Sequence, residues 1–273
     1  MRHFFNALAV GAALLLAAAP VRADLTEVNI FDNTVYEQTS GTAPTSPSFF
    51  FFNAGGNFTS PGDFTSATLT DPTNTVTNLP VSGTSFGFGS SLFTSLSDLH
   101  TTYPFGTYTI TGNGGTAGPQ SETFSYLADA FPTDVPALTA GSFTGLQGMN
   151  AADPFTVNFN AFTPNASLGF TFFSILEGGV TVFTDGFLSN STTSVVIPAN
   201  TLLPGTAYSF ELDFSDRNRA TDPNTGITVD QGFDVRTDGG FTTGAPAVPE
   251  PASVVLFGTV TAALVFFRRR VRN

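Results

Sequence analysis

The chain of 273 residues contains no cysteine, no tryptophan and no lysine, and it has only two histidines. Without cysteine it can form no disulfide, and thiol catalysis, iron–sulfur clusters and cysteine-based zinc sites are excluded. All nine basic residues are arginines, and between Asp24 and Val248 three arginines stand against 20 carboxylates, a formal net charge of −17. A surface of this sign repels phosphate groups, so nucleic acid is excluded as a partner.

Residues 1–23 have the pattern of a secretory signal peptide. Arg2 supplies the initial positive charge, and a run rich in alanine and leucine follows it. Val21 and Ala23 are the small residues expected at the −3 and −1 positions of a cut before Asp24. We therefore expect the secretion machinery to export the chain and signal peptidase to cleave it between Ala23 and Asp24.

A second apolar stretch, residues 252–267, lies near the C-terminus between Pro249-Glu250-Pro251 and a cluster of arginines. Sixteen residues of helix cover about 24 Å, less than the ~30 Å hydrocarbon core of a bilayer. The arginine cluster favours the cytoplasmic side, which leaves the acidic body on the far side of the membrane. The sequence therefore predicts a short C-terminal transmembrane helix. The arginines of the cluster are Arg268, Arg269, Arg270 and Arg272.

The segment Val248-Pro249-Glu250-Pro251, the apolar helix and Arg268 to Arg270, in this order, resemble the PEP-CTERM sorting signal of Gram-negative bacteria. The resemblance covers only the last 26 residues. It implies that an exosortase, a membrane-embedded transpeptidase-like enzyme, recognises the chain while it is transiently anchored in the inner membrane, and cleaves it near Pro249–Pro251. It also implies a final location at the cell surface or in the extracellular matrix, with exopolysaccharide as a candidate partner.

Between its two ends the sequence is typical of β-structure. Short segments rich in threonine and phenylalanine alternate polar and apolar residues, most clearly from Tyr208 to Phe214 and from Thr156 to Ala161. Leu92, Leu96 and Leu99 indicate one short helix before Tyr103. Turn sequences separate the segments, among them Asn113-Gly114-Gly115, Glu177-Gly178-Gly179, Asp185-Gly186, Asp222 to Gly226 and Asp238-Gly239-Gly240.

Two similar segments of the sequence indicate two such β units. Pro104 to Tyr108 and Pro204 to Tyr208 both lead into a strand, and both are similar to the tyrosine corner of fibronectin type III and immunoglobulin-like sandwiches. Tyr108 and Tyr208 are therefore expected to be architectural. We predict an all-β fold of two tandem antiparallel β-sandwich domains. The expected organisation is signal peptide 1–23, domain 24–130, linker 131–137, domain 138–241, flexible tether 242–248 and sorting signal 249–273.

Catalytic chemistry has little support in the sequence. After signal removal His100 is the only histidine, so a Ser–His–Asp arrangement is not excluded by count alone. We expect His100 to lie at the solvent edge and name no catalytic residue. Calcium is the one cofactor that the sequence leaves open, because carboxylates and an amide gather near the last expected hairpin. The calcium candidates are Asp213, Asp216, Asp222, Asn224 and Asp230.

These observations favour an exported, non-enzymatic surface or matrix protein with a structural or interaction role. A carbohydrate-binding module is the first alternative, although the chain lacks tryptophan and has five tyrosines. A secreted hydrolase is the second alternative, and it requires a cleft with paired carboxylates whose pKa values are raised. Fold class alone does not separate these functions.

Overall fold

A computed structural model describes residues 25–115, 118–128, 130–166 and 168–245 of the protein. The chain is 53% strand and 6% helix, which confirms the all-β prediction. Within the described ranges no helix has the length and apolar character needed to cross a membrane. The expected signal peptide and C-terminal helix both lie outside these ranges.

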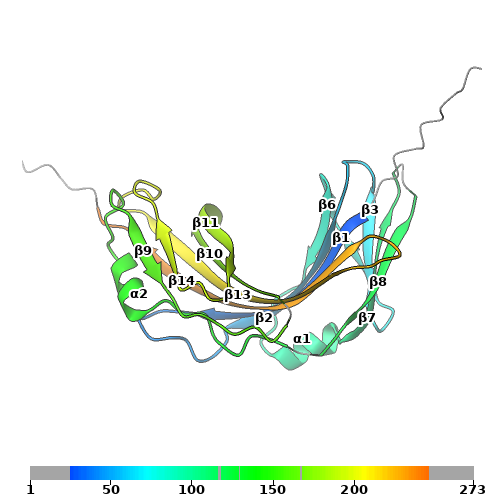
Figure 1. Ribbon diagram of the computed structural model, residues 1–273, viewed down its shortest axis with the longest axis horizontal. Coiled ribbons are helices and arrows are strands. Elements are labelled where there is room, and N and C mark those ends of the chain that lie inside the picture. Colours follow the sequence, from blue (N-terminus) through cyan, green and yellow to red (C-terminus); the bar gives the residue numbers. More distant parts are fainter. Residues whose placement is uncertain (1–24, 116–117, 129, 167, 246–273) are drawn as a thin grey trace, which may run out of the picture. The chain divides into compact units, whose positions relative to one another are not determined.

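The strands form three sheets (Figure 1). The first has eight strands in the order β11-β10-β13-β14-β1-β2-β6-β5, the second has the order β4-β3-β7-β8, and the third pairs β12 with β9. The elements are β1 (Leu25–Glu37), β2 (Phe49–Phe58), β3 (Ser66–Thr70), β4 (Val76–Leu79), β5 (Val81–Ser82), β6 (Ser85–Gly89), α1 (Leu96–Thr102), β7 (Gly106–Asn113), β8 (Gln120–Tyr126), α2 (Ala140–Leu146), β9 (Phe155–Asn158), β10 (Leu168–Glu177), β11 (Val180–Ser189), β12 (Ser194–Ile197), β13 (Ala207–Thr221) and β14 (Thr228–Thr242).

The chain divides into two compact units, but they are not consecutive in the sequence. Of the residues that the structure describes, those within 25–32, 50–128 and 217–232 belong to unit 1, and those within 33–49, 130–216 and 233–245 belong to unit 2. The domains expected from the sequence, 24–130 and 138–241, are each one continuous stretch, whereas each unit combines three separate stretches of the chain. The reason is that the long strands β1, β13 and β14 each contribute one part to each unit.

The expected linker, residues 131–137, is part of unit 2 instead. The carbonyl oxygen of Pro136 accepts a hydrogen bond from the Thr237 hydroxyl, and the Ala137 N–H donates to the Asn160 side chain at 2.8 Å. The beginning of the expected tether is also bound to this unit, because Thr242 ends β14 and the Gly244 N–H donates to the Met149 carbonyl at 2.7 Å. A tether can therefore begin only beyond residue 244.

Unit 1 buries aromatic side chains between its strands. Phe52 on β2 and Tyr108 on β7 are fully buried, with ring centroids 6.1 Å apart. The expected short helix is confirmed as α1, whose N-cap is Ser95. The Ser95 hydroxyl accepts from the Asp98 N–H at 3.1 Å, which satisfies a backbone donor of the first turn.

Unit 2 has a core of 18 buried side chains from β9, β10, β12, β13, β14, α2 and their connecting loops. The alternating residues predicted on β13, which include Phe210 and Phe214, lie in this core and are fully buried. Because successive strand residues point to opposite faces, the residues between them project away from the core. Glu211 and Asp213 are two of these, and both are half-buried.

Two expected turns lie inside strands. Asp238-Gly239-Gly240 is part of β14, and Asp185-Gly186 is part of β11, where the pairing with β10 shifts register between Thr171 and Phe173. Phe187 next to it has φ +55°, which is uncommon for a bulky residue. The extra residue forms a β-bulge, so the glycine there accompanies a kink and not a chain reversal.

Candidate functional site

An ionic cluster occupies the outward face of β13 and β14 in unit 2. The Arg236 Nε lies 2.9 Å from the Asp238 Oδ1, and its Nη1 lies 3.3 Å from the Glu211 Oε1. Arg236 and Asp238 are two positions apart on β14, so both side chains project from the same face. The Asp238 side chain is 31% exposed and that of Arg236 is 25% exposed, which places the cluster at the edge of solvent.

Asp238 also lines a cavity of about 340 Å³ in the same unit. The walls combine two aromatic rings, two hydroxyl groups, two carboxylates and glycine backbone, and they come from four separate stretches of the chain. The lining residues are Val35, Tyr36, Glu37, Ser48, Phe49, Ser209, Asp238, Gly239 and Gly240. Aromatic rings beside polar hydrogen-bonding groups are the composition of a small-molecule site.

Burial raises the pKa of Asp238 to about 6, against the opposing effect of the Arg236 guanidinium. Glu211 and Glu37 raise it further, because their negative charges disfavour another carboxylate nearby. Three acidic side chains, Glu37, Glu211 and Asp238, and one guanidinium therefore act on this site, and two of the three acids, Glu37 and Asp238, line the cavity.

The glycine after Asp238 has a packing reason. A Cβ at Gly239 would lie 2.5 Å from the Phe210 ring and 2.8 Å from the Gln38 carbonyl oxygen, so no larger residue fits without a shift. The Gln38 N–H donates to the Asp238 carbonyl at 2.8 Å. These contacts hold the backbone beneath Asp238 and fix one wall of the cavity.

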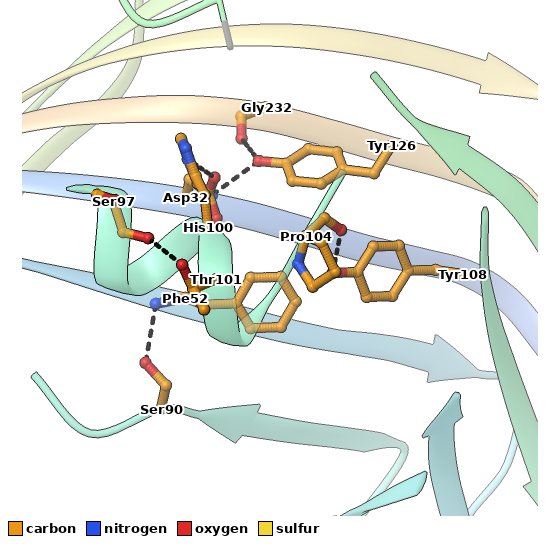
Figure 2. A network of polar contacts seen from close by, with 10 residues as sticks. All are labelled: Asp32, Phe52, Ser90, Ser97, His100, Thr101, Pro104, Tyr108, Tyr126 and Gly232. Carbon is orange, nitrogen blue, oxygen red and sulfur yellow. Dashed lines mark hydrogen bonds and ion pairs between the residues drawn. The ribbon is translucent and has the colours of Figure 1, made fainter. Parts of the chain in front are cut away.

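A second polar cluster lies in unit 1 around the lone body histidine (Figure 2). The His100 Nε2 lies 3.0 Å from the Oδ2 of Asp32, which is fully buried, whereas the His100 side chain is 21% exposed. The Tyr126 hydroxyl accepts from the Asp32 N–H at 3.1 Å and donates to the Gly232 carbonyl at 3.0 Å. The network joins α1, β1, β8 and β14 within unit 1, so its evident role is structural.

Both tyrosines interpreted as corners have the hydrogen bond that this interpretation requires. The Tyr108 hydroxyl donates to the Pro104 carbonyl at 2.8 Å, and the Tyr208 hydroxyl accepts from the Leu203 N–H at 2.8 Å. Tyr108 is fully buried and Tyr208 is 5% exposed. Each hydroxyl thus fixes the chain just before the strand that carries it.

The five calcium candidates are not brought together. Asp216 is buried in unit 2, where its carboxylate accepts the N–H groups of Asn165 at 2.6 Å and Ala166 at 2.8 Å. Asp213 lies three positions away on β13 and therefore on the opposite face. Over the ranges that the structure describes, no group of three or more His, Cys, Asp or Glu side chains is placed to hold a metal ion.

The other three candidates belong to unit 1 and have their own partners. Asp230 pairs with Arg217 at 3.3 Å. Asp222 accepts the Asn224 N–H at 2.6 Å within the turn between β13 and β14. This hydrogen bond lowers the pKa of Asp222, as expected for a carboxylate that stabilises a turn.

Residues 247–270 match the family model of the PEP-CTERM protein-sorting motif. The match confirms the resemblance at Pro249, Glu250 and Pro251 and at Arg268 to Arg270. The sorting residues and the expected signal cleavage between Ala23 and Asp24 lie outside the described ranges. The motif indicates an exported protein of the cell surface and implies recognition by an exosortase.

No curated protein matches the chain. Among solved structures, a 1.5-MDa bacterial ice-binding adhesin matches with TM-score 0.23 and 16% identity, over 81% of this chain and 66% of the adhesin structure. The BSP domain of a biofilm-associated protein matches with TM-score 0.22 and 14% identity, over 84% of this chain and 30% of that one. Domains FN1–FN3 of chicken CNTN1 match with TM-score 0.22 and 10% identity, over 84% of this chain and 69% of the CNTN1 structure. TM-scores this low do not establish a shared overall fold.

Of the cavity residues, Asp238, Gly239 and Gly240 were expected from the sequence only to form a turn, and none was predicted to line a binding site. The cavity residues lie at positions 35–37, 48–49, 209 and 238–240, so no local motif connects them. One usable signal was present: Arg236 and Asp238 stand two positions apart in a chain with three body arginines. In a strand this spacing places opposite charges on one face.

Proposed function

We propose that the chain is an exported protein that an exosortase sorts through its C-terminal motif, and that its β body then acts at the cell surface or in the extracellular matrix. The observation that carries this proposal is the match of residues 247–270 to the PEP-CTERM motif. The motif implies a transient inner-membrane anchor, a Gram-negative host and cleavage near Pro249–Pro251. The role of the body is structural or interactive, with exopolysaccharide as the favoured partner.

A carboxylate-dependent hydrolase is the competing function, and Asp238 is the observation in its favour. Its pKa of about 6 suits a general acid, and it lines a cavity. Against this role, both Asp238 oxygens face Arg236, at 2.9 Å and 3.1 Å. A carboxylate held by a guanidinium is a poor proton donor, and we therefore favour binding over catalysis.

The test follows the mature protein in a Gram-negative host with and without an exosortase. Three chains are compared: the wild type, the double variant Pro249→Ala/Pro251→Ala and a chain that ends at Val248. The expected result for the wild type is an intact mass that lacks residues 1–23 and the C-terminal helix, with protein outside the inner membrane only when the exosortase is present. The double variant should keep its C-terminus and stay in the membrane.

Retention of the full C-terminus by the wild type in the exosortase host would overturn the sorting proposal. In that case residues 252–267 would act as a permanent anchor. The chain that ends at Val248 is the control for the body. It should leave the membrane both in the host with an exosortase and in the host without one.

A further inference from the structure

We propose that the cavity bounded by Tyr36, Phe49 and Asp238 binds an amino sugar with a free ammonium group, as a unit of a polysaccharide. The inference rests on the proposed function, since it names the chemistry of the exopolysaccharide partner. It concerns unit 2 alone and uses no residue of the sorting motif.

The size and walls of the cavity suit one or two sugar units. Its volume of about 340 Å³ lies at the lower end of the range of about 300–1,000 Å³ for small-molecule sites. Tyr36 and Phe49 offer apolar surfaces against which the C–H face of a pyranose can pack. Ser48 and Ser209 add hydroxyl groups that can donate to or accept from sugar hydroxyls.

The charges around the cavity favour one class of sugar over the others. Arg236 contacts the carboxylates of Glu211 and Asp238, at 3.3 Å and 2.9 Å, and Glu37 lines the cavity beside Asp238. A uronic acid or phosphate would add negative charge to a site that already has an excess of it. A neutral sugar would leave that excess in place, whereas an ammonium group neutralises part of it and also gains attraction to an aromatic ring.

A second copy of this chain cannot supply the ammonium group from a side chain, because the sequence has no lysine. A lysine-rich partner protein carries the same charge but lacks the rigid C–H face that the two rings fit. The cavity is also too small to admit the surface of a folded protein. An amino sugar is therefore the occupant that satisfies both the charge and the walls.

The experiment measures binding to the purified full-length protein in mild detergent by calorimetry at pH 7. The probes are a glucosamine hexamer with free amines, the N-acetylglucosamine hexamer and hexalysine. The wild type should bind the glucosamine hexamer at least ten-fold more tightly than either other probe. The variants Asp238→Asn and Tyr36→Ala should each weaken this binding about ten-fold or more.

Glu177→Gln is the matched control, since it removes one negative charge from an exposed position of unit 2 that does not line the cavity. It should leave the affinity within two-fold of the wild type. Circular dichroism and thermal unfolding establish that each variant is folded before binding is measured. A second readout, release of reducing sugar from the hexamer, should stay at background because the site binds without cleaving.

Three outcomes would overturn the proposal. Equal loss with Glu177→Gln and Asp238→Asn would indicate attraction by net charge alone. Equal binding of the N-acetylated hexamer would remove the role of the ammonium group, and tighter, Asp238-dependent binding of hexalysine would assign the cavity to a lysine-bearing protein. Because the assay uses purified protein, none of these results depends on whether the exosortase processes the chain.

Discussion

Unit 1 and unit 2 each bury a tyrosine whose hydroxyl bonds to the segment just before its strand, but the two hydrogen bonds run in opposite directions. Tyr108 donates to the Pro104 carbonyl, whereas Tyr208 accepts from the Leu203 N–H. Burial, with a smaller effect of Asp32, raises the pKa of Tyr108 well above its usual range, so this hydroxyl keeps the proton that it donates. The same corner motif therefore serves two different backbone groups.

The polar clusters of the two units differ in a second way. In unit 1, Asp32 and Tyr126 are fully buried, the Tyr126 hydroxyl bonds to two backbone groups, and only His100, at 21% exposure, reaches solvent. In unit 2, Asp238 and Arg236 stay partly exposed beside a cavity. A closed polar network stabilises a fold, and an open one of unbalanced charge can bind a ligand. Substitutions in the cluster of unit 1 should therefore lower stability most, and substitutions in the cluster of unit 2 should weaken binding most.

The largest effect is expected for Tyr126→Phe. The change deprives the buried Asp32 N–H and Gly232 carbonyl of their shared partner, which should lower the free energy of unfolding by about 2–3 kcal/mol. Urea unfolding followed by circular dichroism measures the loss. Tyr103→Phe is the control, because Tyr103 is half-buried and packs through its ring, 4.3 Å from that of Phe52. Equal losses for the two variants would contradict the closed-network interpretation.

A smaller difference should separate Tyr108→Phe from Tyr208→Phe. We expect a loss of about 1.5 kcal/mol for the first, since Tyr108 is fully buried, and about 0.5 kcal/mol for the second. The Leu203 side chain is 60% exposed, so water can reach the N–H that Tyr208 leaves. Parallel thermal unfolding curves measure both losses, and a larger loss for Tyr208→Phe would reverse the comparison.

The pH dependence of stability should show the charge imbalance of unit 2. The pKa of Asp238 is higher in the folded protein, about 6, than its ordinary value of 3.8, so its protonation favours folding. This contribution is fully present below pH 3.8 and is lost as the pH rises through 6. Relative to Asp238→Asn, the wild type should lose about 1 kcal/mol between pH 4 and pH 7, a figure discounted for exposure. Parallel pH profiles would contradict the raised pKa.

Calcium should have the smallest effect. Asp216 and Asp230 already bind N–H groups and Arg217, respectively, so Ca²⁺ would have to displace these partners. We expect the melting temperature to change by less than about 1 °C between 5 mM Ca²⁺ and a chelator, because a ligand stabilises a fold only when it binds it. A rise of several degrees, abolished in Asp222→Asn, would restore the calcium hypothesis.

Local patterns predicted the local structure well. Alternation from Tyr208 to Phe214 predicted β13, because strand periodicity follows directly from which side chains must be buried. Leu92, Leu96 and Leu99 predicted α1, although Leu92 is exposed and lies before the helix begins. Helix α2 was missed because Ala140–Leu146 contains two glycines and little helical periodicity. The prediction of a turn at Asp185-Gly186 was wrong because a glycine in a strand can also accommodate a bulge.

The arrangement in space was harder to predict. The interleaved units depend on where strands β1, β13 and β14 divide, and of the three dividing positions Asp32 and Asp216 have no glycine or proline beside them, while Gly232 alone is a glycine. The cavity was missed for a related reason, since its carboxylates Glu37 and Asp238 come from β1 and β14, which are neighbours in the sheet but far apart in the sequence. A pKa shift caused by burial and by neighbours depends on packing, which composition does not reveal.

The interleaving also determines when the protein can fold during its synthesis and export. Unit 1 needs residues 217–232 and unit 2 needs residues from 233 onward, so neither unit is complete until nearly the whole body has emerged. A gene fragment cut near codon 130 would therefore encode neither unit in full, because it would lack β13 and β14, which contribute to both units.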